Sequence, residues 1–137
     1  MKKVEVRDRG RLKASIAKIF KAERRKVGEV QYIFCSDKYL LDINHRFLGH
    51  DYYTDIITFP LSSDTQPIVA EVYISVDRVR ENAIKFQNSL RNELTRVIFH
   101  GALHLCGYRD KTAAEQAKMR ALEDQYLHAH VSTWNNT

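Results

Sequence analysis

The chain has 137 residues and a mass of 16.0 kDa, enough for one domain that buries about two-thirds of its unfolded surface. Its 44% hydrophobic and 28% charged shares are ordinary, and no apolar run approaches the roughly 20 residues that cross a bilayer. The formal net charge of +5 favours RNA or DNA as a partner, although surface lysines alone would give the same balance. Two cysteines exclude a disulfide framework, and the basic start lacks the apolar stretch of a signal peptide, so we expect a cytoplasmic protein without a membrane partner.

Four segments with alternating or β-rich sequence predict the strands of one sheet. They are residues 3–6, 30–35, 54–59 and 68–76. The last two are joined through the turn-rich residues 60–64, which resemble a hairpin connection, whereas a predicted helix separates the second strand from the third. The sheet should therefore be mixed.

Apolar residues at helical spacing predict five helices. The first runs from about residue 9 to 26 and is expected to end before Gly28. The other four are expected to begin at capping residues. These are Ser36 or Asp37, Asp77, Ser89, and Thr112 in the capping box of residues 112–115. The pattern predicts a single α+β domain over residues 1–137, with a mixed four-stranded sheet covered by helices and a metal site in a cleft.

The stretch HGALHLCGYRD, residues 100–110, carries the most informative chemical pattern. Residues four apart on a helix lie on one face, so His100 and His104 can offer two imidazole nitrogens to one metal ion. Gly107 ends the helix, and the chain can then fold back so that Asp110 supplies a carboxylate oxygen. Such a set leaves a fourth position for water, which is typical of a catalytic metal rather than a closed structural one.

Two alternatives limit this interpretation. Two histidines can fall at helical spacing by accident, one in the core and one on the surface, so the spacing alone does not establish a metal site. A zincin protease would carry a glutamate directly after the first histidine, where this chain has Gly101. The sequence thus argues against a peptidase, and the small Gly101 would allow another segment or a substrate backbone to approach closely.

The histidine stretch resembles the signature of the YbeY family, bacterial metal-dependent endoribonucleases that act in ribosomal RNA maturation. Residues 41–60 (LDINHRFLGHDYYTDIITFP) and 70–75 (AEVYIS) resemble further segments of that family, and the resemblance extends from about residue 30 to 126. It implies that His100, His104 and Asp110 hold one divalent metal ion per chain, zinc first, with nickel or manganese as alternatives.

The same resemblance implies a single-strand-specific endoribonuclease that acts on the 3′ end of small-subunit ribosomal RNA and in ribosome quality control. The implied partners are ribosomal RNA and the small subunit, with ribosomal proteins or an assembly GTPase as further candidates. The alternative is a non-catalytic RNA-binding assembly factor with a structural metal. A hydrolase for a peptide or a small ester is a second alternative, which the missing glutamate beside His100 weakens.

This chain departs from the family pattern at two functional positions. Asp110 stands where the family normally has a third histidine; a carboxylate still binds zinc, but its charge leaves bound water less acidic and favours harder ions such as manganese. Leu48 stands where the family carries a functionally important arginine. Arg109, beside the expected ligand, is a substitute that could neutralise phosphate, and Arg46 is a weaker one because it should point from another helix face. For Arg109, a solvated arginine is the ordinary alternative.

The general base that would act on a metal-bound water is not identified by the sequence. Glu71 and Asp55 are the candidate carboxylates. The expected rim of the cleft consists of His50, Asp51, Thr54 and Asp55. Thr54 and Asp55 could instead cap the strand and fix the loop, because alternate strand residues cannot all face one cleft.

Four other residues with reactive side chains are interpreted as non-functional. Cys35 and Cys106 are expected to be structural, Cys106 as a small buried residue. His128 and His130 are expected to be solvated in a polar tail, and residues 132–137 to be frayed.

Overall fold

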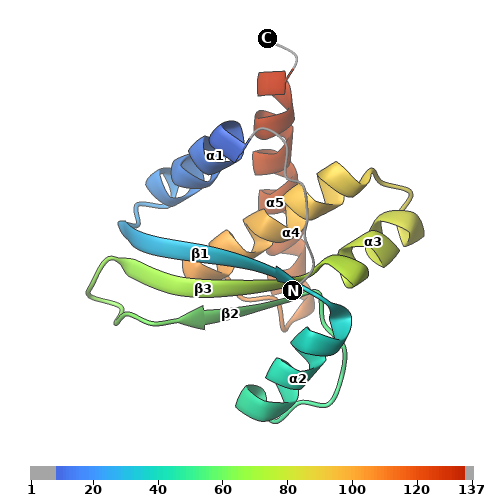
Figure 1. Ribbon diagram of the computed structural model, residues 1–137. Helices are drawn as coiled ribbons and strands as arrows, with labels where there is room; N and C mark the ends of the chain where they lie inside the picture. The colour runs from blue at the N-terminus through green and yellow to red at the C-terminus, as the bar shows by residue number, and fades with distance from the viewer. Residues whose placement is uncertain (1–8, 135–137) are drawn as a thin grey trace.

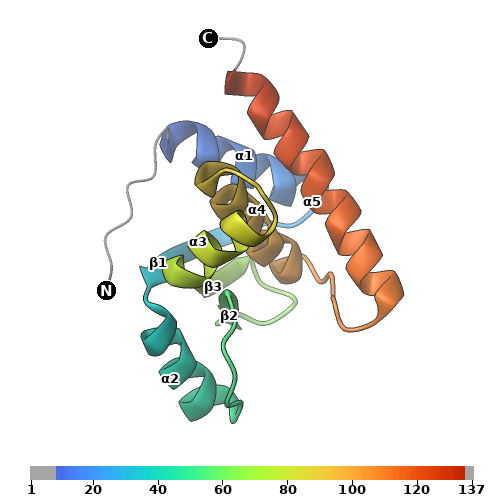
Figure 2. The same ribbon diagram turned by 90° about the vertical axis from the view of Figure 1, so that its right-hand side faces the viewer.

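The computed structural model describes residues 9–134, which form five helices and three strands. In chain order they are α1 (Arg9–Ala22), β1 (Val27–Cys35), α2 (Asp37–Leu48), β2 (Ile56–Pro60), β3 (Ile68–Ser75), α3 (Val76–Lys85), α4 (Leu90–Leu105) and α5 (Ala113–Trp134). Helices α1, α4 and α5 lie on one side of the sheet and α2 lies on the other (Figure 1). Figure 2 shows the same separation from a second direction. The α+β architecture predicted from the sequence is confirmed.

The central strand of the sheet is β3, which pairs in parallel with β1 and antiparallel with β2. In this register Val72 lies opposite Tyr32 of β1 and Thr58 of β2. The mixed sheet and the hairpin-like β2–β3 connection are therefore as predicted. The sheet has three strands within residues 9–134 rather than the expected four, and the expected strand at residues 3–6 lies outside the described residues.

Alternation along β3 divides the interior into two cores. Ala70, Val72 and Ile74 face α4 and belong to the main core, together with buried residues of α1, α4 and α5. Tyr73 faces the opposite side and packs against a smaller core beneath α2. The buried members of this α2 core are Cys35, Leu40, Ile43 and Ile57. Alternate residues of β3 thus pack into the main core or into the core beneath α2.

Helix α4 passes through the main core, and Gly101 lets it lie close to the sheet. A Cβ atom at this position would lie 2.8 Å from Cδ1 of Ile56 and 3.2 Å from Cγ1 of Val72. Contacts under about 3 Å force a neighbour to move, so a larger residue would displace the helix or the strand. The segment that Gly101 admits is therefore the sheet itself, and this packing sets the distance between α4 and β2.

The predicted caps Ser36 and Ser89 are confirmed, because each serine side chain accepts a hydrogen bond from a backbone N–H of the first turn. The capping box at the start of α5 is confirmed as well: Thr112 and Glu115 bond each other's backbone N–H groups. Among residues 9–134, none of the five helices has the length and hydropathy of a membrane-spanning segment.

Two predicted helix boundaries were wrong. Ser75 rather than Asp77 caps α3, because the Ser75 hydroxyl accepts from Arg78 N while the Asp77 carboxylate accepts from Asp37 N at the start of α2. Helix α1 ends at Ala22 rather than near residue 26. Arg24 makes the turn with φ 59°, so Gly28 is not needed as a stop and lies within β1.

Candidate metal centre

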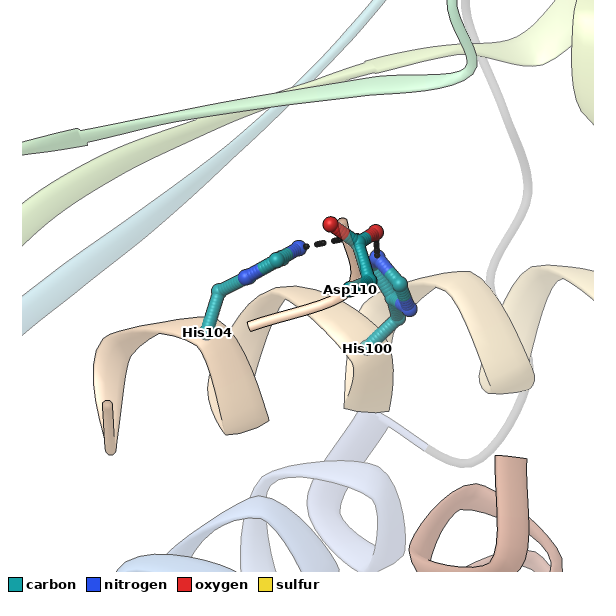
Figure 3. Close-up of side chains that lie close together, drawn as sticks. All are labelled: His100, His104 and Asp110. Carbon is teal, nitrogen blue, oxygen red and sulfur yellow. Dashed lines mark ion pairs between the residues drawn. The ribbon is translucent and has the colours of Figure 1, made fainter. Parts of the chain in front are cut away.

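His100 and His104 lie one turn apart on α4, and their side chains converge on the carboxylate of Asp110 (Figure 3). The Nε2 atoms of the two histidines lie 3.3 and 3.4 Å from Oδ2 of Asp110. One ligand atom from each of the three residues can be chosen so that all lie within 4.8 Å of one another. The fold thus brings together the three residues that the sequence suggested as ligands, and we call them the His–His–Asp cluster.

The turn after α4 carries Asp110 back to the histidines. Gly107 has φ 106°, a conformation that side chains other than hydrogen strongly disfavour, and its N–H donates to the His104 carbonyl at 3.0 Å. The next residue, Tyr108, donates its backbone N–H to the Leu103 carbonyl and its hydroxyl to Glu23 at 2.6 Å. The chain is therefore fixed on both sides of the reversal, and Asp110 follows two residues later.

Each histidine uses its Nδ1 atom to hold its ring in place. Nδ1 of His104 lies 2.9 Å from the carbonyl oxygen of Tyr108, and Nδ1 of His100 lies 2.6 Å from Oε2 of Glu123. A carbonyl or an ionised carboxylate can only accept a hydrogen bond, so Nδ1 carries a proton in both rings, and Nε2 is the nitrogen that a neutral ring offers to a metal. Metal-ligating histidines have this arrangement, with the second nitrogen bonded to a carboxylate or backbone carbonyl. The donor set therefore fits a divalent cation.

Glu123 on α5 is a functional residue that the sequence analysis missed. Its side chain is buried, and it accepts from Arg96 at 3.3 Å in addition to His100. Arg96 in turn pairs with Asp124 at 2.8 Å. A signal was available: Glu123 lies four residues after Met119 and three before Tyr126, so it shares a helix face with these apolar residues, and a carboxylate is rarely buried without a partner. The identity of that partner depends on packing between α4 and α5.

Three carboxylates surround the two imidazoles, so the site attracts cations. Burial lowers the pKa of His100, but the hydrogen bond and charge of Glu123 raise it, and the charges of Asp55 and Asp110 add to that effect. The outcome is a pKa above the ordinary value of histidine. Burial also raises the pKa of Asp55, against the opposing influence of His100.

Two clefts meet at the His–His–Asp cluster. The first, of about 360 Å³, lies between the cluster and the segment that joins α2 to β2. The second, of about 570 Å³, lies between α3, α4 and α5. Asp55, His100 and Asp110 line both clefts. A chain molecule could therefore pass from one cleft to the other across the cluster.

Of the expected rim residues, His50, Thr54 and Asp55 line the first cleft. Thr54 also bonds the Ile56 carbonyl at 3.3 Å, and the Asp55 carbonyl accepts from Ser75 N at 2.9 Å. The capping role weighed for these two residues and a place at the cleft are therefore compatible: their backbone and hydroxyl groups fix the start of β2 while the Asp55 carboxylate lies beside His100.

Glu71 lies on the opposite face of the sheet from the His–His–Asp cluster. It alternates with Val72, which packs in the main core, and its carboxylate accepts from the Tyr73 hydroxyl at 3.3 Å. The expectation that Glu71 is a general base has to be corrected, because β3 itself separates its carboxylate from the histidines.

The two arginines named as RNA-binding candidates also lie apart from one another. Arg46 is on the α2 side, where it pairs with Asp42 at 3.4 Å and lines the same shallow groove as Glu71. The side chain of Arg109 is 69% exposed and lies 3.9 Å from Glu115, next in sequence to Asp110. Leu48, at the position of the family arginine, lines the first cleft.

The expectation that His130 is solvated in a polar tail was wrong. Its ring is buried, lies 2.5 Å from the Ser15 hydroxyl and packs edge-on against Phe99 with centroids 5.6 Å apart. Helix α5 continues through residue 134, and His130 therefore connects α5 to α1 and α4 rather than lying in a tail. His128 is exposed, as expected, and Cys35 is buried; Cys106 is only partly buried.

Comparison with known proteins places the whole arrangement in a family. A family model described as endoribonuclease YbeY matches residues 2–131. The endoribonuclease YbeY of Cytophaga hutchinsonii is 47% identical over 123 residues, covering 90% of this chain and 86% of its own, and that of Flavobacterium psychrophilum is 46% identical over 112 residues, covering 82% and 79%. The solution structure of TM1509 from Thermotoga maritima is similar with a TM-score of 0.61 and 30% identity, over 96% of this chain and 89% of that one. The chain described here belongs to the endoribonuclease YbeY family.

Proposed function

We propose that this protein is a metal-dependent endoribonuclease that cleaves single-stranded RNA. Its family is one of RNA-cleaving hydrolases by name, and relatives sharing nearly half of its residues bear that name. The observation that carries the proposal is the His–His–Asp cluster, in which both Nδ1 atoms are engaged and both Nε2 atoms face Asp110.

His100, His104 and Asp110 would hold one divalent cation, zinc first, with nickel or manganese as alternatives. When bound, such an ion polarises a phosphate oxygen and makes a water molecule a better nucleophile. Other residues of the chain hold the ligand atoms in position. Glu123 and the Tyr108 carbonyl fix the imidazole rings, and Gly107 forms the turn that brings the carboxylate of Asp110 to them.

Asp55 is the residue we assign as the general base. Among residues 9–134 it is the one carboxylate besides Asp110 that lines both clefts, and it lies close enough to His100 for their charges to interact. Its partial burial keeps bulk water from competing for the proton that it takes from the attacking water. Asp55 would then pass that proton to solvent through either cleft.

The two clefts suggest a path for the substrate. Arg120 lines the second cleft and could bind a phosphate of the backbone, and Arg109 lies exposed beside the cluster. The net charge of +5 would strengthen attraction to RNA at low salt. Arg46 lies on the far side of the sheet and is not part of this path.

Within this class of activity we propose ribosomal RNA as the substrate, at the 3′ end of the small-subunit RNA and in ribosome quality control. The partners would be the small subunit, with ribosomal proteins or an assembly GTPase, and the location the cytoplasm. These assignments rest on the resemblance of residues 41–60, 70–75 and 100–110 to the YbeY family and on the basic net charge.

The test is the His104→Ala variant, compared with His128→Ala as a matched control. His128 is an exposed histidine of α5 away from the cluster, so its loss should change nothing. We expect His104→Ala to lose bound metal and cleavage of single-stranded RNA together, with an unchanged far-UV circular dichroism spectrum. Metal content is measured on protein purified without chelators, and cleavage is measured with single-stranded and duplex RNA, with and without EDTA.

Metal-dependent cleavage by His104→Ala at the wild-type rate would overturn the assignment, because the cleavage would then come from another site or from a contaminating nuclease. If wild-type protein binds RNA and metal but never cleaves, and His104→Ala unfolds as it loses the metal, the alternative of a non-catalytic assembly factor with a structural metal is correct.

A further inference from the structure

The segment between α2 and β2 presents two stacked aromatic rings in the first cleft. The rings of His50 and Tyr52 have centroids 5.1 Å apart and planes inclined by 21°, and the Tyr52 hydroxyl lies 2.9 Å from Nδ1 of His50. Both residues line the cleft that also contains His100 and His104, yet Tyr52 is 56% exposed. The pair is therefore ordered by contact between its own members and open to the cleft.

Asn44 holds this segment in place from inside α2. Its side chain is almost fully buried, and its amide group donates to the Tyr52 carbonyl at 2.9 Å. Its backbone carbonyl accepts from His50 N at 3.2 Å, after Gly49 has ended the helix with φ 68°. One buried residue thus fixes the backbone of both aromatic residues, so their rings are oriented before any ligand arrives.

The neighbouring Tyr53 differs from the stacked pair because its ring contacts a side chain from another part of the protein. It is 54% exposed, almost as much as Tyr52, but its ring lies 5.3 Å from the guanidinium carbon of Arg78. It does not line the first cleft. The stacked pair, by contrast, makes no such contact with the rest of the protein among the described residues, and its exposed ring faces need another explanation.

We propose that His50 and Tyr52 form a platform on which a nucleobase of the RNA strand stacks, next to the phosphate that lies at the His–His–Asp cluster. This inference rests on the proposed function and names how the substrate is recognised. An unpaired base offers its flat face to an aromatic ring, whereas the bases of a duplex already stack on one another. The platform therefore selects unpaired RNA, with little preference among the four bases.

The experiment compares Tyr52→Ala, Tyr52→Phe and Tyr53→Ala in the metal-loaded enzyme. The probe is a short single-stranded RNA whose 2′-O-methyl groups slow cleavage, for binding, and its unmodified form, for kinetics. Because base stacking on an aromatic residue contributes about 1–3 kcal/mol, we expect Tyr52→Ala to weaken binding about 5- to 150-fold. Tyr52→Phe recovers most of the loss because the ring remains, and Tyr53→Ala binds as wild type.

A second arm identifies the contact. Abasic sites are placed one at a time along the same RNA, and we expect one position at which the missing base weakens binding to wild type but not to Tyr52→Ala. That non-additivity is the behaviour of a base and a side chain in direct contact. A merely structural role for Tyr52 would leave the penalty of every abasic site unchanged.

The inference is overturned if Tyr52→Ala, with wild-type metal content, binds and cleaves the RNA like wild type, or if every abasic penalty persists in it. Those results would leave the proposed function intact, because wild type would still cleave. If wild type itself neither binds nor cleaves single-stranded RNA, the proposed function fails first and the platform with it.

Discussion

The two faces of the sheet carry similar residue types, but only one of them builds a site. On the α4 face, two histidines, Asp110 and Asp55 are partly buried and each imidazole is held by a second group. On the α2 face, Glu71 makes a hydrogen bond of 3.3 Å to Tyr73, and Arg46 lies at the surface. Carboxylates and cations on both faces could act on RNA. What separates the faces is the support of the side chains: the histidines beside α5 and β2 are partly buried and held by further groups, whereas Arg46 and its partner Asp42 are exposed.

The apolar side chains show the same contrast. Phe99 of α4 is fully buried in the main core, whereas Phe47 of α2 is 65% exposed and touches Phe59 edge-on with centroids 6.1 Å apart. Phe99 thus fixes α4 against the rest of the main core, whereas part of α2 is open to solvent. Three pairs of variants test this comparison.

The largest difference is expected between the two candidate carboxylates. Asp55→Asn should lower kcat by about 10²- to 10⁴-fold with metal content unchanged, because the amide cannot take a proton from the attacking water. Glu71→Gln should cleave like wild type, since its carboxylate lies on the other face. Single-turnover cleavage of a short RNA measures both. A similar loss in the two variants would show that the faces are not functionally distinct.

A smaller effect, on metal affinity, is expected from removing the carboxylate that orients His100. Glu123→Gln should weaken metal binding by about 10- to 100-fold, because the partners that orient a ligating histidine contribute that much. The matched control is Asp124→Asn, which removes the other carboxylate bound to Arg96 but leaves His100 untouched. Competition with a chelator of known affinity gives both constants. Equal losses would mean that Arg96, rather than the bond to His100, is responsible.

The smallest effect concerns the spacing between α4 and the sheet. Gly101→Ala should destabilise the protein by about 1 kcal/mol, because overpacking against Ile56 exceeds the gain in helix propensity. Adding Ile56→Val removes the atom that the new methyl group meets, so the double-mutant cycle should show a favourable coupling of about 1 kcal/mol. Urea unfolding measures each variant.

A control for that cycle is Gly10→Ala in α1, where a Cβ atom meets nothing within 4 Å. This variant should not lose stability. If Gly101→Ala behaves in the same way, the close approach of α4 to the sheet is not a constraint.

Local features of this protein were readable from its sequence because local interactions cause them. Ser36, Ser89 and the Thr112 capping box bond backbone groups within four residues, so their patterns identify helix starts directly. The spacing of His100 and His104 predicts a shared helix face for the same reason. The hairpin-like link between β2 and β3 was also visible in a turn-rich segment.

Features that depend on partners distant in sequence were missed or misassigned. Ser75 replaced Asp77 as a cap, because Asp77 bonds the start of α2, which is 40 residues away. The polar sequence around His130 predicts a solvated tail residue, whereas Ser15, 115 positions earlier, lies against it. No periodicity within one element contains this information, because it arises when elements pack.

The sequence by itself thus determined the α+β class, the helix that carries two histidines and the family to which the motif belongs. The sequence also suggested Asp110 as the third ligand, and the structure brings its carboxylate to those histidines. The tertiary structure alone decided that Glu123 orients one of them and that Asp55 rather than Glu71 shares their side of the sheet. The physical reason is that helix spacing and capping act over a few residues, whereas the ligand geometry depends on how a turn, a fifth helix and the strand alternation meet in space.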